Sequence, residues 1–135
     1  MAGYFTESNY ENAVLQLLNE ELGYNYIYGP DVERDYHSPL YEDVLLPSLQ
    51  RINKGLPMDA LTEAVYKLKN FETGTLLQKN MVFMDYLQNG VPVKYYDKGE
   101  ERSTLVYLVD FKNPASNEFT VANQWTFIEN SEKRP

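Results

Sequence analysis

The sequence predicts an α+β fold, in which helices fill the N-terminal two-thirds of the chain and an antiparallel three-stranded meander follows. Two observations support this prediction. Up to Gly90 the apolar residues recur every three or four positions, which is the period of an amphipathic helix. Beyond Gly90 they alternate every second position, which is the period of a half-buried strand. The 135 residues suffice for one hydrophobic core, so we predict a single domain over residues 1–135.

The first helix is predicted over residues 7–22, with Thr6 or Ser8 as its N-cap. A short strand or extended segment should follow over residues 24–28, where tyrosines alternate with other residues until Gly29-Pro30 breaks the run. The apolar stripe of the helix consists of Tyr10, Val14, Leu17, Leu18 and Leu22.

Three more helices are predicted before the change of period. The first has Ser38 as its cap and Pro39 at its first position, and Pro47 inside it should kink or break it. The second starts at Pro57, and the third covers residues 76–89. The third is marked by Leu76, Leu77, Met81, Met84 and Leu87.

The strands of the meander are predicted over residues 91–96, 102–111 and 118–128. Residues 97–100, Asp-Lys-Gly-Glu, should form the turn of a hairpin between the first two strands. Residues 113–117 should form the turn to the third strand. One face of the second strand is expected to carry Leu105, Tyr107, Val109 and Phe111.

The composition excludes several classes of function. The chain has no cysteine and one histidine, which excludes a disulfide framework, a thiolate metal site and a multi-histidine zinc site. A net charge of −8 argues against a free-standing nucleic-acid binder, because phosphate recognition needs clustered Lys and Arg. No stretch has the roughly 18 consecutive apolar residues of a membrane-spanning helix, and the first ten residues lack the pattern of a signal peptide. We therefore expect no membrane segment and favour a cytoplasmic location.

Carboxylates are the candidate functional groups, because oxygen ligands suit a hard cation such as Mg²⁺. Glu7 and Glu11 lie one helical turn apart and share a face of the first helix. Glu11 also follows Ser8 by three residues, which is the spacing of a capping box, so a structural role is its alternative. The sequence contains no Gly-rich phosphate loop and no metal cluster of recognised spacing.

Four other residues have both a functional and a structural interpretation, and His37 has a structural one. Asp110 precedes a turn, and we expect it to serve the turn before it serves as a ligand. Asn123, Gln124 and Trp125 could contact a nucleotide through amide hydrogen bonds and stacking. We favour a core position for Trp125 and amide bonds to neighbouring backbone. His37 is interpreted as a loop residue.

A series of short motifs also follows one another along nearly the whole chain, and the predicted hairpin from Asp110 to Gln124 is their most specific part. They are Thr6-Glu7, Leu22-Gly23-Tyr24, Gly29-Pro30, Arg51-Ile52-Asn53, Leu56-Pro57, Asp110-Phe111, Asn113-Pro114, Asn117-Glu118-Phe119 and Asn123-Gln124. In this order they resemble the N-terminal nuclease domain of the restriction (R) subunit of type I restriction-modification enzymes.

The resemblance implies a PD-(D/E)xK nuclease fold, which is a mixed sheet flanked by helices. In that pattern a helix-one Glu, a strand Asp and a Glu-x-Lys form an Mg²⁺ site, where the carboxylates hold the metal against the scissile phosphate. The helix-one Glu corresponds here to Glu11 or, as the alternative, to Glu7. The Asp would directly follow Arg134-Pro135, and the Glu-x-Lys would come later. We therefore expect an incomplete nuclease domain that does not cut DNA by itself.

The resemblance also implies the properties of a whole R subunit. Such a subunit carries helicase-like motor domains that hydrolyse ATP, and it cleaves unmodified foreign DNA in complex with specificity and methylation subunits. ATP would bind outside these residues. Two alternatives stay open, namely an acidic module that binds a protein or mimics DNA, and a nuclease-like binding domain without catalysis.

Overall fold

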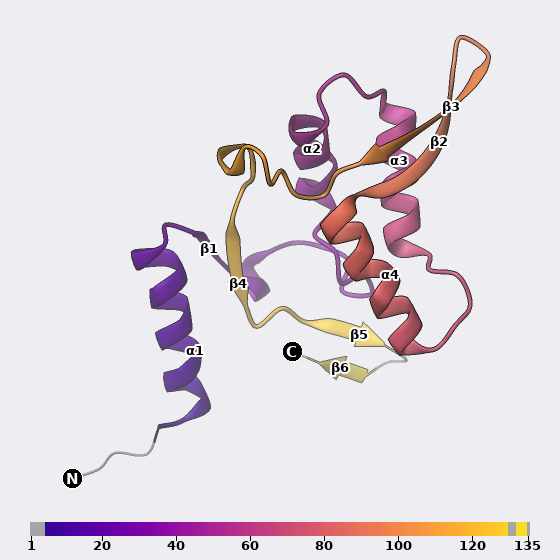
Figure 1. The fold of residues 1–135 in the computed structure, drawn as a ribbon. Coiled ribbons are helices and arrows are strands. Elements are labelled where there is room, and N and C mark those ends of the chain that lie inside the picture. The colour runs from indigo at the N-terminus through magenta and orange to yellow at the C-terminus, as the bar shows by residue number, and fades with distance from the viewer. Residues whose placement is uncertain (1–4, 130–131, 135) are drawn as a thin grey trace. The chain divides into compact units, whose positions relative to one another are not determined.

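The computed structural model describes residues 5–129 and 132–134, and its chain divides into two compact units. The first unit combines residues 1–41 with residues 119–135, and the second is the continuous segment 42–118. Helices and strands both occur, which confirms the predicted α+β class (Figure 1). The assignment of residues 1–135 to a single domain stays a prediction.

Helix α1 opens the first unit and confirms the first predicted helix. It spans Glu7–Gln16, and a π-helical turn over Leu17–Glu21 continues it. The hydroxyl of Thr6 caps it by accepting a hydrogen bond of 3.2 Å from the backbone amide three residues later. Because Thr6 is the N-cap, Ser8 lies inside the helix and the capping box considered for Glu11 does not form.

One sheet of the first unit consists of two parallel strands. Strand β1, Asn25–Tyr28, pairs with β4, Thr120–Asn123, so that Asn25 stands opposite Thr120 and Tyr28 opposite Asn123. The two strands lie side by side in Figure 1. The predicted short strand is confirmed, but the antiparallel meander is wrong in its third strand. Alternation of period two indicates a strand and contains no information about its partner, here almost a hundred positions away.

The predicted third strand is also shorter than expected, because the chain turns after β4. Gln124 has a φ of +52°, which is the left-handed region and ends the extended conformation. A second short strand, β5, spans Phe127–Glu129 and pairs antiparallel with β6, Glu132–Arg134. Pro135, which belongs to the Arg134-Pro135 motif, lies outside the described residues.

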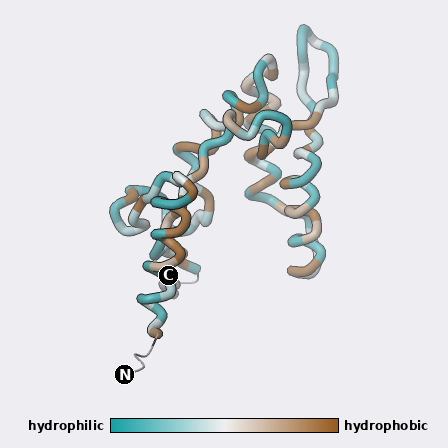
Figure 2. Tube along the Cα trace, turned by 60° about the vertical axis from the view of Figure 1, so that its left-hand side comes forward, coloured by the Kyte–Doolittle hydropathy of each residue, from teal (hydrophilic) through white to brown (hydrophobic). Residues whose placement is uncertain are grey.

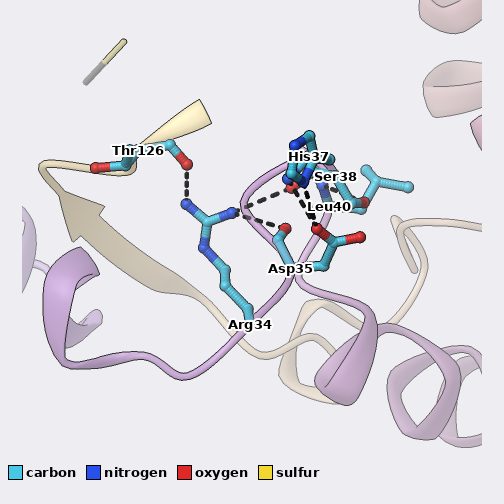
Figure 3. Close-up of polar contacts among 6 residues, drawn as sticks. All are labelled: Arg34, Asp35, His37, Ser38, Leu40 and Thr126. Atoms are coloured by element: carbon cyan, nitrogen blue, oxygen red, sulfur yellow. Dashed lines mark hydrogen bonds and ion pairs between the residues drawn. The ribbon is translucent and has the colours of Figure 1, made fainter. Parts of the chain in front are cut away.

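The loop after β1 is held against the segment that follows β4. The guanidinium of Arg34 donates hydrogen bonds to the backbone carbonyls of Thr126 and Ser38, the second at 3.1 Å (Figure 3). Its central carbon also lies 3.9 Å from the centre of the Trp125 ring, a cation–π contact. This single side chain therefore ties the polar loop to the chain just beyond Gln124.

Three helices and a hairpin make up the second unit. The helices are α2, Glu42–Ile52, α3, Met58–Lys69, and α4, Leu76–Asn89 (Figure 1). The hairpin joins β2, Val91–Asp97, to β3, Glu100–Val106, in antiparallel register. No helix in residues 5–129 and 132–134 is long and apolar enough to span a bilayer.

The start of α2 differs from the prediction. The helix begins at Glu42 rather than after Ser38 and Pro39. The hydroxyl of Ser38 instead accepts a hydrogen bond of 3.4 Å from the backbone amide of Leu40, within the loop. Acidic residues in the first turn of α2 favour the later start, because they complement the positive end of the helix dipole. Pro47 lies inside α2 without breaking it, and a kink there stays a prediction.

The buried core of the second unit lies between α3 and the hairpin. Two alanines on α3 let the strands approach closely, because they add little volume. The core residues are Leu49 from α2, Ala60, Leu61 and Ala64 from α3, and Val91, Val93 and Val106 from the hairpin.

The second strand of the hairpin, predicted over residues 102–111, ends at Val106, and the face that it buries is not the one that carries Leu105. Val106 stands opposite Val91 and is buried, whereas Leu105 and Tyr107 are exposed. Residues 105–109 are all apolar, so alternation alone could not tell the two faces apart. The buried partner Val91 decides which face turns inward.

The turn of the hairpin is confirmed. Lys98 and Gly99 have φ values of 51° and 81°, and two consecutive positive φ angles are typical of a type I′ turn. Such a turn matches the right-handed twist of the strands. Figure 2 shows this tip in the colours of hydrophilic residues, as expected for a solvent-exposed turn.

Helix α4 is confirmed in position, and none of its residues is fully buried, although Tyr86 packs against the core. Leu76, Leu77 and Met81 are 85%, 69% and 64% exposed. Two aromatic contacts attach the helix to the preceding loop, since the ring of Phe71 lies 6.3 Å from Phe83 and 6.0 Å from Tyr86.

Candidate functional site

Glu11 is joined to the end of β4 by three side-chain hydrogen bonds. The Asn123 amide Nδ2 donates to Glu11 Oε1 at 2.6 Å. The Gln124 amide Nε2 donates to both carboxylate oxygens at 3.2 Å. Three residues that the sequence marked as candidates therefore meet in the first unit. The expectation that the two amides bond neighbouring backbone is wrong, because their partner is a side chain of α1.

A cavity of about 510 Å³ lies beside this carboxylate. Helix α1 contributes Glu7, Tyr10 and Glu11 to its wall, and the end of β4 contributes Asn123 and Gln124. The two alternative glutamates therefore face the same space. Only Glu11 contacts the amide pair in the bonds described above, so its position is the better defined of the two.

The described residues do not form a complete metal site. Within residues 5–129 and 132–134, no three His, Cys, Asp or Glu side chains lie close enough together to hold a metal ion. Protein sites for Mg²⁺ commonly use one or two carboxylates together with water or phosphate oxygens. Glu11 therefore fits as one ligand of such a site, while the rest of a ligand set would have to come from elsewhere.

Tyr26 also belongs to the corner around Glu11, Asn123 and Gln124. Its place in a segment of alternating tyrosines does not indicate this in the sequence. Its hydroxyl donates to Asn123 Oδ1 at 2.8 Å. The tyrosines of this segment look equivalent in the sequence, so only the pairing of β1 with β4 distinguishes Tyr26.

Asp110 serves the loop of the second unit, as the turn interpretation predicted. Its Oδ1 accepts hydrogen bonds from the backbone amides of Lys112 at 3.1 Å and Asn113 at 2.9 Å. The side chain of Asn117 exchanges hydrogen bonds with the backbone of Asp110, at 2.8 and 2.9 Å. These contacts form an Asx turn closed by a second amide.

The Arg51-Ile52-Asn53 motif fixes both ends of the same loop. Asn53 is 6% exposed, and its amide exchanges two hydrogen bonds of 2.8 Å with the backbone of Tyr107. Arg51 Nε donates to the backbone carbonyl of Ser116 at 2.7 Å. The motif therefore has a structural role that periodicity alone did not indicate.

The remaining candidates have structural surroundings. His37 is an exposed loop residue, as predicted, and its Nδ1 lies 3.1 Å from Asp35 Oδ1. Trp125 is half-buried rather than a core residue. Its indole Nε1 donates to the backbone carbonyl of Pro39 at 3.0 Å, and its ring centre lies 5.5 Å from that of Tyr41.

The second unit contains a larger cavity, of about 760 Å³, between α3 and α4. Tyr66, Lys67, Phe71 and Tyr86 are among the residues of its wall, and none of the predicted site residues lies there. Burial raises the pKa of the Tyr86 phenol above its usual value, and the nearby carboxylates raise it further. Its wall also contains two carboxylates, those of Glu63 and Glu72.

Comparison with known proteins gives one family. Residues 4–135 match the family model described as the N terminus of the type I restriction enzyme R protein. A Methanocaldococcus jannaschii protein named for the endonuclease subunit of the type I restriction enzyme MjaIXP is 31% identical over 121 residues, which cover 85% of this chain and 12% of that protein. The type I restriction enzyme HindI endonuclease subunit of Haemophilus influenzae is 30% identical over 126 residues, covering 87% of this chain and 12% of the relative. No solved structure matches the chain.

Proposed function

This chain belongs to the family of N-terminal regions of type I restriction enzyme R proteins, and we propose that it is part of the nuclease domain of an endonuclease that cuts unmodified foreign DNA with ATP and Mg²⁺. The chain spans 12% of the length of the relatives it matches, which are named endonuclease subunits. The observation that carries the proposal is the convergence of Glu11 with the Asn123-Gln124 motif at one cavity.

In this proposal residues 1–135 supply the scaffold and one carboxylate of a PD-(D/E)xK site. Glu11 holds one coordination position for Mg²⁺, and the bound ion supplies stabilisation of charge at the scissile phosphate. The principal Asp and the Glu-x-Lys lie outside this chain. Residues 1–135 by themselves therefore cut no DNA.

Two features of the first unit support a larger sheet in the whole protein. Strands β1 and β4 are parallel, and parallel sheets are normally covered by helices on both faces. Helix α1, which lies beside them, has no buried residue within the described part of the chain. Additional strands from the same polypeptide would give this helix a surface to cover.

The proposal extends to the partners of the whole protein. Motor domains elsewhere in the polypeptide bind ATP, and specificity and methylation subunits complete the complex in the cytoplasm. The net charge of −8 is compatible with this arrangement, because basic tracks for DNA can lie on those other parts.

The test uses the full-length protein encoded by the source gene, assembled with its specificity and methylation subunits. Cleavage of an unmethylated plasmid is measured with ATP and Mg²⁺ for the wild type, Glu11→Gln and Glu7→Gln. We expect Glu11→Gln to lower the cleavage rate by about 100-fold or more, because loss of a ligand exceeds the usual effect of an outer contact. ATP hydrolysis should stay unchanged, and Glu7→Gln tests the alternative ligand, since it should cleave like the wild type if Glu11 is the ligand. A cleavage rate of Glu11→Gln equal to that of the wild type would show that Glu11 is not part of the site. Cleavage by residues 1–135 alone would refute the proposal that they are inactive.

A second candidate function is a protein-interaction module, and the exposed apolar residues of α4 favour it. Leu76 and Leu77 are 85% and 69% exposed, and neighbouring exposed apolar residues can mark a protein-interaction surface. This reading expects a full-length protein that cuts no DNA under any of the above conditions. Cleavage by the wild type with ATP and Mg²⁺ would decide against it.

A further inference from the structure

The corner formed by Asn123 and Gln124 depends on a glycine of the loop after β1. Gly29 is buried, and a Cβ atom added to it would lie 2.4 Å from the backbone oxygen of Gln124 and 2.6 Å from that of Asn123. Real Cβ atoms do not approach oxygen so closely, and backbone cannot move aside as a flexible side chain can. The backbone of the corner therefore rests directly on Gly29, and only glycine leaves room for it.

The left-handed conformation of Gln124 explains how two consecutive side chains reach one carboxylate. In an extended strand, neighbouring side chains point to opposite faces of the sheet. A φ of +52° at Gln124 breaks this alternation and brings its amide to the same side as that of Asn123. Such a conformation is unfavourable for a non-glycine residue, and such outliers cluster at functional sites.

The Asn123 amide is held at both ends, by Tyr26 and by Glu11. An asparagine amide has a donor end and an acceptor end, and a rotation of 180° exchanges them. The Glu11 carboxylate only accepts, so it takes the donor end, Nδ2, and the Tyr26 hydroxyl donates to the acceptor end, Oδ1, at 2.8 Å. Without this hydroxyl, the acceptor end of the amide would lose this contact and the side chain would be held at one end fewer.

We propose that Tyr26, Gly29, Asn123 and Gln124 are positioning residues that fix the direction of the Glu11 carboxylate. Gly29 leaves room for the backbone, the left-handed Gln124 aligns the two amides, and the Tyr26 hydroxyl anchors the acceptor end of the Asn123 amide. The carboxylate is then held in one direction toward the cavity before a cation binds. This inference rests on the proposed function of Glu11 as an Mg²⁺ ligand.

The first experiment measures cleavage by the full-length complex as a function of Mg²⁺ concentration. Removal of a residue that orients a metal ligand typically weakens metal affinity or activity by about 10–100-fold. We therefore expect Asn123→Ala to raise the Mg²⁺ concentration for half-maximal cleavage by about tenfold, and Tyr26→Phe to raise it less. Gln16→Ala is the matched control, because Gln16 Nε2 bonds Glu20 Oε2 at 3.1 Å on the same helix, outside the corner. It should leave the Mg²⁺ requirement unchanged.

A second measurement does not depend on activity. In the ¹⁵N NMR spectrum of the 135-residue chain, the side-chain amide signals of Asn123 and Gln124 should move when Glu11 is replaced by Gln. Tyr26→Phe should move the Asn123 signal, whereas Gln16→Ala should move neither. Unchanged amide signals in Glu11→Gln would overturn the contact itself.

The outcomes separate this inference from the proposed function. If Glu11→Gln abolishes cleavage while Asn123→Ala keeps the wild-type Mg²⁺ requirement, the positioning role is refuted and the role of Glu11 stands. If Glu11→Gln cleaves normally, the proposed function of Glu11 fails first. If Asn123→Ala raises the Mg²⁺ concentration for half-maximal cleavage tenfold and Tyr26→Phe leaves it unchanged, Tyr26 is not a positioning residue.

Discussion

The side chain of Asn53 should contribute about 2 kcal/mol to the stability of the second unit, because its removal leaves polar backbone without partners. Asn53 Nδ2 donates to the carbonyls of Leu49 at 2.9 Å and Tyr107 at 2.8 Å, and its Oδ1 accepts from the Tyr107 amide at 2.8 Å. In Asn53→Ala all three bonds disappear.

The magnitude follows from which groups lose their last partner. The Leu49 carbonyl keeps a hydrogen bond of 2.8 Å from the backbone amide of residue 53. The amide and carbonyl of Tyr107 lose these bonds, and an unsatisfied buried group costs about 1–3 kcal/mol. Tyr107 is half-exposed, so water partly replaces the lost partners. The expected loss is therefore near the lower end of the sum for two groups, about 2 kcal/mol.

The assay is urea unfolding of the 135-residue chain at pH 7, followed by far-UV circular dichroism. Asn70→Ala is the matched control, because Asn70 Nδ2 makes one exposed bond of 2.9 Å to the Tyr66 carbonyl on α3. It should change the free energy of unfolding by less than about 0.5 kcal/mol. If Asn53→Ala is as stable as Asn70→Ala, the buried amide does not hold the end of β3 as described.

Three further predictions concern other parts of the chain. Gly29→Ala should displace the corner at Gln124 and lower the melting temperature, because the added Cβ would overlap backbone oxygens. A melting temperature equal to that of the wild type, with unshifted Gln124 amide signals, would contradict this. Thr75→Ala should destabilise α4 by about 1 kcal/mol, because Thr75 forms a capping box, and urea unfolding by circular dichroism would measure the loss. The phenol of Tyr86 should ionise above its usual pKa of 10.0, because burial and then nearby carboxylates disfavour its charged form, and the absorbance titration at alkaline pH of wild type minus Tyr86→Phe gives its value. Since the folded pKa is the higher one, the contribution of Tyr86 to stability is complete below the unfolded pKa and is lost as pH rises toward the folded pKa, so Tyr86→Phe should flatten the alkaline decline in stability.

Local patterns predicted local structure well. Periodicity and turn chemistry placed α1, α3, α4 and the hairpin turn, because each of these depends on residues close together in the sequence. The partner of β4 could not be predicted in this way. A parallel pair requires a long connection, and nothing within residues 120–123 distinguishes pairing with β1 from pairing with the hairpin.

The candidate site shows the same division between local and distant information. The sequence indicated that Glu11 shares a helix face with Glu7, and family resemblance singled out Asn123-Gln124. Neither observation placed them together, since their contact depends on the parallel pairing of β1 with β4. The capping-box interpretation of Glu11 failed for a local reason. It required Ser8 as the N-cap, and the N-cap is Thr6, two residues before Ser8.

The motifs that carry the family resemblance therefore have two different physical roles. Arg51, Asn53 and Asp110 bind backbone within the second unit and stabilise its loop. Asn123 and Gln124 bind the side chain of Glu11 in the first unit. Substitutions of the first group should lower the free energy of unfolding without changing the Mg²⁺ requirement for cleavage. Substitutions of the second group should change that requirement even where stability is preserved, so the two measurements together distinguish a scaffold motif from a motif of the site.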